Sequence, residues 1–202
     1  MIKKGLIRIL VFLSIACFFL LSVQIALADV GQDILNTACK YDGKYNPKDE
    51  GKPEKDHEQC KGFVKYVYDE ALGVALPSTS SDWNTWDSYE QYGFRAVSIF
   101  NPLNIRFEQG TRYTKEYMFT EFCFPLKPGD ALQVDGKSDP HTMIYIGTNT
   151  DANNFATGIL VVEANRHAYN IVHIEEWTLE QLWNYMGGTA SNGITAYRYV
   201  GN

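Results

Sequence analysis

Four side chains in this sequence have the types needed to hydrolyse an amide bond through a covalent intermediate: Cys60, His141, Glu163 and Asn165. A cysteine thiolate is a strong nucleophile, and a histidine can take up its proton and return it to a leaving amine. A polar partner on the second ring nitrogen keeps the imidazole oriented. Cys60 heads the aromatic and β-branched stretch "EQCKGFVKYVY". It could be a buried structural thiol, half of a disulfide or a nucleophile.

Of the four histidines, His141 has the most suitable position for a catalytic base. His57 is too close to Cys60 in sequence to face it across a cleft. His167 follows a predicted strand in a turn, and His173 lies within an alternating strand as an ordinary strand-face residue. His141 opens a strand after a Pro-Gly-Asp turn, which would hold its ring rigidly beside a cleft. An ordinary histidine at a strand end is the structural alternative.

Glu163 and Asn165 lie two residues apart in the apolar stretch "ILVVEANR". In a strand, such residues share one face, while Val162 and Ala164 point to the other face and into the core. If this strand lies beside the one that begins with His141, either polar residue could orient the imidazole. A solvated polar face is the alternative.

Helical periodicity places Cys60 within a predicted helix over residues 57–73. Apolar residues recur at helical spacing, at Cys60, Phe63, Val64, Val67, Tyr68, Ala71 and Leu72. Asp56 is a suitable N-cap and Gly73 a suitable stop. Cys60 then lies in the first turn on the inward face, where the helix N-terminus favours the thiolate.

The other patterns predict an α+β domain, with N-terminal helices packed on a C-terminal antiparallel sheet. Helices are expected over 31–39 and within 76–93, and a third over 178–188 begins with a capping box of Thr178 and Gln181. The predicted strands are 130–134, 141–147, 158–166, 170–177 and 194–200. Residues 40–58 read as a solvated, charged loop without the ordered ligand spacing of a calcium site. Residues 94–124 show no clear pattern and are interpreted as a possible insertion.

Residues 1–28 have the features of a secretory signal peptide: a basic start, an apolar middle and the cleavage pattern Ala26-Leu27-Ala28. A membrane anchor is the alternative, although the apolar run is short for a span. Cleavage would leave a single soluble domain over residues 29–202. Three of the 18 basic residues and none of the 24 acidic ones lie in the leader, which leaves 15 against 24 and a formal charge of −9. This charge argues against nucleic acid or anionic lipid as the main partner.

Three cysteines remain after cleavage: Cys39, Cys60 and Cys123. An odd number in an exported protein suggests one pair and one free thiol. We therefore predict a Cys39–Cys123 disulfide that leaves Cys60 free. The sequence predicts no metal site and no cofactor.

These motifs together resemble the papain-like cell-wall hydrolases. The pattern "C-x-G-F-V-x-Y-V" from Cys60 and the segments "LKPGDALQV" and "HTMIYIG" are similar to NlpC-type peptidases. The pairs Gln59-Cys60 and Glu163-Ala-Asn165 resemble CHAP domains, which are cysteine, histidine-dependent amidohydrolases/peptidases. The chain departs from the NlpC pattern at Lys61, where those enzymes usually carry Ser or Thr, and at Gln59, where they carry Asp.

The resemblance implies a papain-like NlpC/CHAP fold and a secreted hydrolase of peptidoglycan. The scissile bond would lie within the stem peptide or join that peptide to the sugar. Cys60 would be the nucleophile and His141 the general base, with Glu163 and Asn165 as polar support. The papain-like pattern slightly favours Asn165 as the residue that orients His141.

Several alternatives remain open at the level of the sequence. Four residues are candidates for binding the substrate, with core packing as the alternative for the aromatic ones: Tyr45, Gln59, Trp83 and Trp86. The chain could instead be a catalytically idle binding or inhibitory module on the same fold. An exported antibacterial toxin would use the same chemistry as the wall hydrolase.

Overall fold

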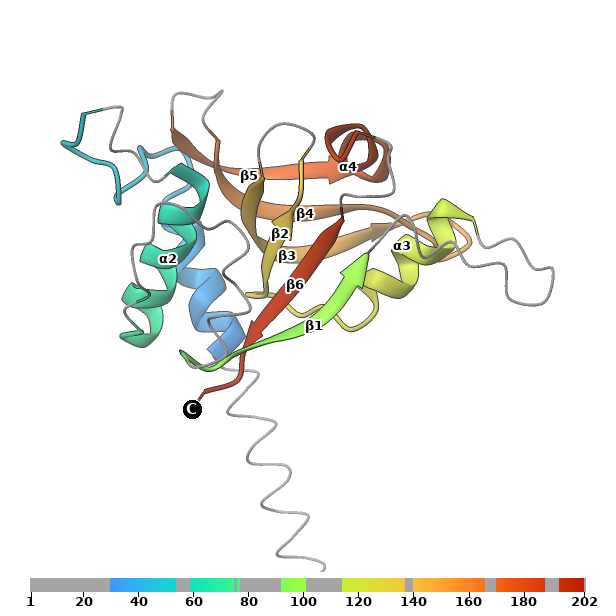
Figure 1. The fold of residues 1–202 in the computed structure, drawn as a ribbon, viewed down its shortest axis with the longest axis horizontal. Helices are drawn as coiled ribbons and strands as arrows, with labels where there is room; N and C mark the ends of the chain where they lie inside the picture. Colours follow the sequence, from blue (N-terminus) through green and yellow to red (C-terminus); the bar gives the residue numbers. More distant parts are fainter. Residues whose placement is uncertain are drawn as a thin grey trace, which may run out of the picture.

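The structure is a computed structural model that describes residues 30–53, 59–74, 76, 92–100, 114–136, 140–165, 170–187 and 193–201. Six strands form one sheet in the order β1-β6-β2-β3-β4-β5, and helices cover both of its faces (Figure 1). All paired neighbours run antiparallel. The α+β class predicted from the sequence is confirmed.

The strands of this sheet include every one that the alternation of apolar residues predicts. In chain order they are β1 (Phe94–Phe100), β2 (Ala131–Val134), β3 (His141–Thr150), β4 (Ala156–Asn165), β5 (Ile171–Thr178) and β6 (Ile194–Tyr199). β3 and β4 are the longest, with ten residues each. Their antiparallel pairing fixes which side chains of the two strands lie next to each other.

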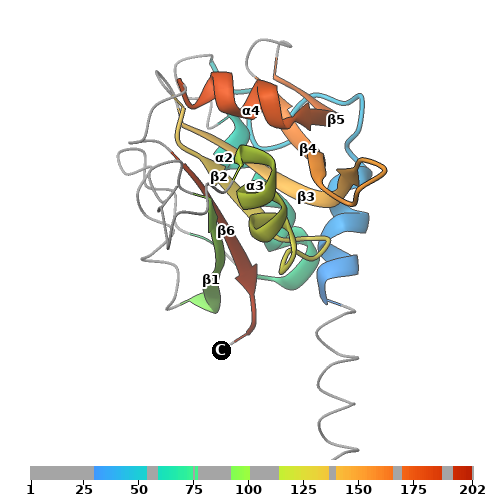
Figure 2. The ribbon, with the colours of Figure 1, turned by 90° about the vertical axis from the view of Figure 1, so that its right-hand side faces the viewer.

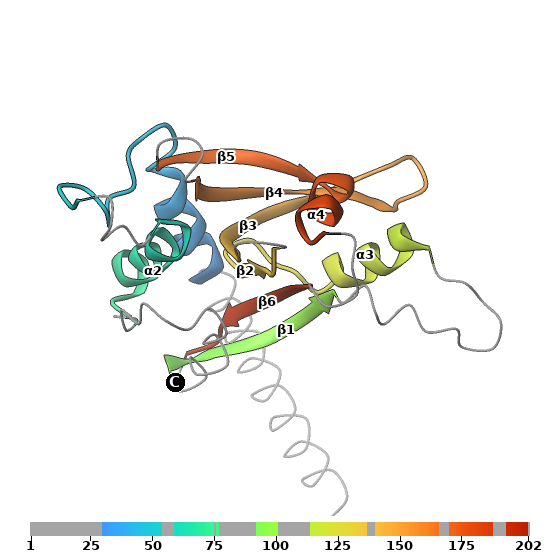
Figure 3. The same ribbon diagram turned by 45° about the horizontal axis from the view of Figure 1, so that its top comes forward.

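Helices pack on the two faces of the sheet over separate apolar cores. A helix over residues 30–39 and α2 (Gln59–Leu72) cover one face. The opposite face is covered by α3 (Lys115–Cys123) and α4 (Leu179–Tyr185), as Figures 2 and 3 show. The strands serve both cores because successive side chains point to opposite faces.

The expected helix over residues 178–188 is present as α4, and its predicted start is confirmed. The Oγ1 of Thr178 accepts a hydrogen bond from the backbone N–H of Gln181, and the Gln181 side chain accepts one from the N–H of Thr178. Both bonds belong to a capping box, which satisfies N–H groups that the helix itself cannot pair.

The segment 94–124, interpreted as a possible insertion, supplies an edge strand and a core helix where the structure describes it. β1 pairs along β6, and a bulge between Ala96 and Ser98 moves its inward side chains from one core to the other. This break in alternation explains why the sequence shows no strand pattern there. α3 begins at the N-cap Thr114 and packs Phe119 and Phe122 into the core.

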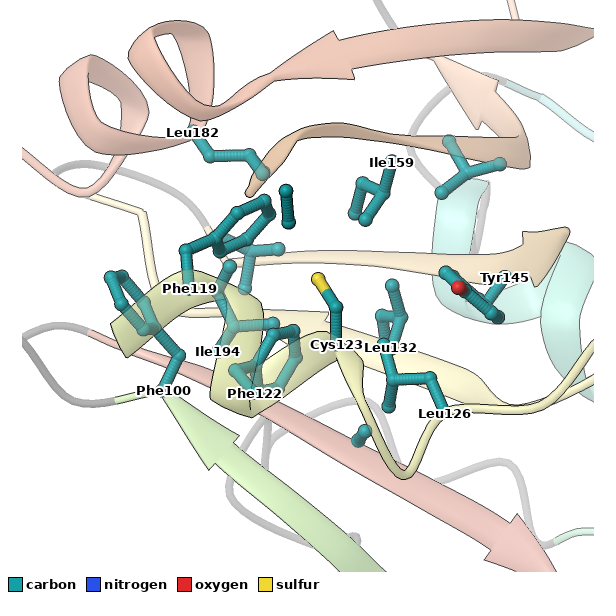
Figure 4. Packing of buried hydrophobic residues seen from close by; sticks show 14 of the residues in the cluster. Phe100, Phe119, Phe122, Cys123, Leu126, Leu132, Tyr145, Ile159, Leu182 and Ile194 are labelled. Carbon is teal, nitrogen blue, oxygen red and sulfur yellow. The ribbon is translucent and has the colours of Figure 1, made fainter. Parts of the chain in front are cut away.

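The predicted Cys39–Cys123 disulfide is wrong, because both cysteines are free in the structure. Cys123 lies among apolar side chains of the core under α3, close to Leu132 (Figure 4). Cys39 packs against the other core, on the opposite face of the sheet. The sheet between the two cores prevents the contact that a disulfide requires.

Several sequence-based predictions lie outside the described residues. These are the leader over residues 1–28, the helix start at Asp56, and most of the helix expected within 76–93, with Trp83 and Trp86. Among the helices that the structure describes, none is long and apolar enough to cross a membrane.

Candidate active site

His141 and Glu163 form a buried pair on two neighbouring strands, where β3 begins and β4 nears its end. The Nε2 of His141 lies 2.5 Å from the Oε2 of Glu163. Glu163 is fully buried, and His141 is only 8% exposed. Both side chains point to the face covered by α3 and α4, because Met143 and Val161, each two residues away, belong to that core. The strand predicted for Glu163 is therefore confirmed. The alternative of a solvated polar face is wrong for this residue, because its side chain is buried.

α2 covers the other face of the sheet, but His141 is the first residue of β3, and Cys60 in the first turn of α2 acts on its imidazole at this strand end. The helix begins at Gln59, and its inward face carries Cys60, Phe63, Val64 and Val67 into the core, as the periodicity predicts. Cys60 is buried and hydrogen-bonds to the imidazole of His141. Since Nε2 is bonded to Glu163, Nδ1 is the ring nitrogen that remains for Cys60.

The environment of His141 favours the imidazolium form. Burial alone lowers the pKa of this ring, but the negative charge and hydrogen bond of Cys60, followed by those of Glu163, raise it to about 10. An imidazolium between a thiolate and a carboxylate forms one hydrogen-bonded chain of alternating charge. In such a chain each charge compensates for the desolvation of its neighbour.

Two aromatic side chains enclose the imidazole. The ring of Trp177 stacks on His141 with the centroids 5.8 Å apart, and Tyr185 approaches edge-on at 6.2 Å. Trp177 and Tyr185 also contact each other at right angles. The face of an aromatic ring attracts a cation, so this arrangement stabilises the protonated ring and keeps water from it. Sequence reasoning missed both residues, although the alternation in "HIEEW" already puts Trp177 on the same face as His173.

Glu175 adds a second carboxyl group behind Glu163. The pairing of β4 with β5 sets Glu163 opposite His173, and Glu175 follows two residues later on the same face. Burial, then the charge of Glu163 and a hydrogen bond with it, raise the pKa of Glu175, whereas His173 and His141 lower it. Glu175 therefore stays protonated to a higher pH than a free glutamate, and its carboxyl O–H donates a hydrogen bond to the carboxylate of Glu163. Sequence reasoning did not single out this residue.

The other predicted residues fall into three groups. His173 lies in β5 beside Glu163, as a strand-face residue. Asn165 ends β4 and pairs with Ile171, while its side chain lies outside the described part of the structure. His57 and His167 lie outside the described residues altogether. Of the two candidates for orienting the imidazole, it is Glu163 that the structure places on His141.

Tyr45 and Gln59, two of the predicted substrate-binding residues, lie on segments close to the nucleophile. Tyr45 is 38% exposed and forms an isolated bridge with Ile171 at the start of β5. Gln59 directly precedes Cys60 and has a positive φ of 51°, which is uncommon for a residue with a Cβ. Trp83 and Trp86 lie outside the described residues.

A separate cavity of about 150 Å³ lies between the first helix, the turn before β2 and the end of β6. Its lining includes Val30, Pro128 and the ion-paired Asp130 and Arg198. None of its lining residues belongs to the Cys60–His141–Glu163 chain. Among the described residues, no group of three or more His, Cys, Asp or Glu side chains could hold a metal ion.

A scan against models of known protein families finds no match to this chain, and a search of curated proteins finds no significant match either.

Proposed function

We propose that the protein is a secreted cysteine hydrolase that cleaves amide bonds in peptidoglycan, on a papain-like fold of the CHAP and NlpC type. One observation carries the proposal: Cys60 hydrogen-bonds to His141, whose Nε2 is held by the buried carboxylate of Glu163. A nucleophile, a base and an orienting group in that order are the parts that covalent amide hydrolysis needs.

In the proposed reaction, the Cys60 thiolate attacks the carbonyl carbon of the amide and its electron pair forms the new C–S bond. The carbonyl π electrons move to oxygen, and the backbone N–H of Cys60 donates to the resulting oxyanion. Collapse of this intermediate breaks the C–N bond, and the proton on Nδ1 of His141 goes to the leaving amine. The products of this half-reaction are the free amine and a thioester on Cys60.

Water completes the reaction. The imidazole, now neutral, takes a proton from the attacking water, and the thioester collapses to release the carboxylic acid and the Cys60 thiolate. Glu163 stays ionised throughout and keeps the ring in the orientation that serves both steps. No metal or cofactor takes part in the proposed mechanism.

The choice of peptidoglycan rests on the motif resemblance, on the predicted leader over residues 1–28 and on the net charge. After export, the protein would act in the periplasm or the medium without stable insertion in a membrane. A formal charge of −9 would keep it from anionic lipid and nucleic acid. We propose Tyr45, Gln59, Trp83 and Trp86 as residues that contact the substrate peptide.

A zymogram on purified cell walls tests the proposal. The wild-type protein should clear the walls, and Cys60→Ser should not. Cys39→Ser is the matched control, because it removes a thiol outside the site and should retain clearing. An idle binding module would bind the walls without releasing fragments. Clearing by Cys60→Ser equal to that of the wild type would refute the proposed nucleophile.

Mass spectrometry of the released muropeptides identifies the bond. A new amino terminus within the stem peptide indicates an endopeptidase, and a free lactyl carboxyl group on the sugar indicates an amidase. The same assay on walls of competing bacteria and on the producer's own walls separates an exported toxin from a remodelling enzyme.

A further inference from the structure

Three polar side chains form a buried cluster next to the nucleophile. Asn46 and Asp49 are fully buried, and Asn170 nearly so. The Nδ2 of Asn170 donates to the Oδ2 of Asp49 at 2.8 Å, and the Nδ2 of Asn46 donates to the same oxygen at 3.0 Å. Asn46 also approaches the Oδ1 of Asn170 at 3.2 Å. We call these three residues the polar cluster.

The polar cluster is built from segments that are distant in sequence. Backbone hydrogen bonds between Gly43, Lys44 and Val172 carry the loop before Asn46 along the edge of β5. A further bond, from the N–H of Asn46 to the carbonyl of Asn170, joins the loop to the turn after β4. The polar cluster is thus fixed to the same strand pair that carries Glu163 and His173.

The polar cluster also holds both backbone groups of Gln59. The N–H of Gln59 donates to the Oδ2 of Asp49 at 2.8 Å, and its carbonyl accepts from the Nδ2 of Asn46 at 2.9 Å. Gln59 has a φ of 51°, a conformation that a residue with a Cβ adopts only when its surroundings impose it. Here the two hydrogen bonds from buried partners impose it.

The bond from Asn46 has a direct consequence for Cys60. The carbonyl of Gln59 and the N–H of Cys60 belong to one planar peptide unit, in which the two groups point in opposite directions. A donor that fixes the carbonyl therefore fixes the direction of the N–H as well, and polarises it. This N–H lies in the first turn of α2, and the described part of the helix has no carbonyl four residues before it, so we take it as the donor to the oxyanion.

We propose that Asn46 is a positioning residue for carbonyl attack, which orients the Gln59–Cys60 peptide so that the N–H of Cys60 meets the oxyanion. Asp49 and Asn170 hold Asn46 in place for this role. The inference rests on the carbonyl chemistry proposed above for Cys60, but not on peptidoglycan as the substrate.

Two reagents separate this role from general support of the thiol. With p-nitrophenyl acetate, the sulfur of Cys60 adds to the acetyl carbonyl through an oxyanion and expels p-nitrophenolate, which leaves an acetyl thioester. With iodoacetamide, the same sulfur displaces iodide from a methylene carbon, and no oxyanion forms. The p-nitrophenolate burst gives the first rate, and mass spectrometry of the Cys60 peptide gives the second.

Asn46→Ala should lower the rate of acylation about tenfold, well below the roughly 100- to 1,000-fold loss that follows removal of a whole oxyanion donor. Its rate of alkylation should stay within twofold of the wild type, with the same pH profile. Asn36→Ala is the matched control, because Asn36 is exposed on the first helix and bonds to the neighbouring Gln32. It should change neither rate. Cys60→Ser gives the background for both reagents.

Asn46→Ser serves as a second variant if Asn46→Ala does not fold. The Oδ1 of Asn46 accepts from the N–H of Lys48 in a turn that a serine hydroxyl can also form, but serine is too short to reach the carbonyl of Gln59. The same selective loss of acylation is expected.

The inference would be overturned if Asn46→Ala lost acylation and alkylation equally, or lost neither. It would also be overturned if the wild-type protein were acylated no faster than Cys60→Ser. A wild type that is acylated but releases no muropeptides would refute the proposed substrate alone. In that case a selective loss in Asn46→Ala would still support the inference.

Discussion

Replacement of Glu163 by glutamine tests the electrostatic core of the site. Glutamine has nearly the same shape as glutamate, and its Oε1 can still accept a hydrogen bond from the Nε2 of His141. The substitution therefore removes one negative charge at 2.5 Å from a buried imidazolium, together with the acceptor for the carboxyl group of Glu175. We expect the pKa of His141 to fall.

The size of this fall follows from the geometry. A hydrogen bond contributes about 1.5–3 kcal/mol when one partner is charged and about 0.5–1.5 kcal/mol when both are neutral, so the charge itself accounts for about 1–1.5 kcal/mol. One pKa unit corresponds to about 1.36 kcal/mol. The pKa of His141 should thus drop by about one unit, from about 10 to roughly 9. It should stay above the ordinary value of 6.5, because the charge of Cys60 is the larger of the causes that raise it.

The assay is an NMR titration of the imidazole nitrogens in protein labelled with ¹⁵N-histidine. The spectrum of His141→Ala assigns the signal of His141 among the four histidines. Glu176→Gln is the matched control, since Glu176 is exposed and points to the opposite face of β5 from Glu175; it should leave the pKa unchanged. If Glu163→Gln also left the pKa of His141 near 10, the carboxylate would not act on the ring as the structure indicates.

Three further predictions follow from the same contacts. Cys60 should react faster with iodoacetamide in the wild type than in His141→Ala, because the imidazolium stabilises the attacking thiolate; equal rates for both proteins would contradict the pairing. Because the folded state raises the pKa of His141 from 6.5 to about 10, its contribution to stability is complete below pH 6.5 and is lost as the pH rises to about 10. The difference in unfolding free energy between the wild type and His141→Ala, measured in urea, should therefore shrink over that range, and a constant difference would refute the linkage. Cys123→Ser should lower the unfolding free energy by about 1–3 kcal/mol. The reason is that the burial that raises the pKa of Cys123 to about 12 also penalises a hydroxyl group. If the urea midpoint of unfolding were the same for Cys123→Ser and the wild type, the thiol would not lie in an apolar core.

The elements that carry the site could be predicted because their signals are local. The 3.6-residue spacing from Cys60 to Leu72 determines a helix and its buried face, and the capping box at Thr178 determines where another helix starts. Alternation of apolar and polar residues likewise identified β3 and β4, with His141 at the start of one and Glu163 near the end of the other. β1 and α3 were not recognised, because a bulge breaks the alternation of the first and α3 is short and only weakly amphipathic.

The sequence by itself therefore determined the types of the reactive residues and the elements that present them. Only the tertiary structure decided that Glu163 holds His141, that Cys39 and Cys123 lie on opposite faces of the sheet, and that Asn46 reaches the peptide before Cys60. The physical reason is the range of the interactions. Periodicity and capping depend on residues within a few positions of each other, whereas buried polar groups must find partners wherever the fold brings them, as Asn46 does with Asn170, which is 124 positions away.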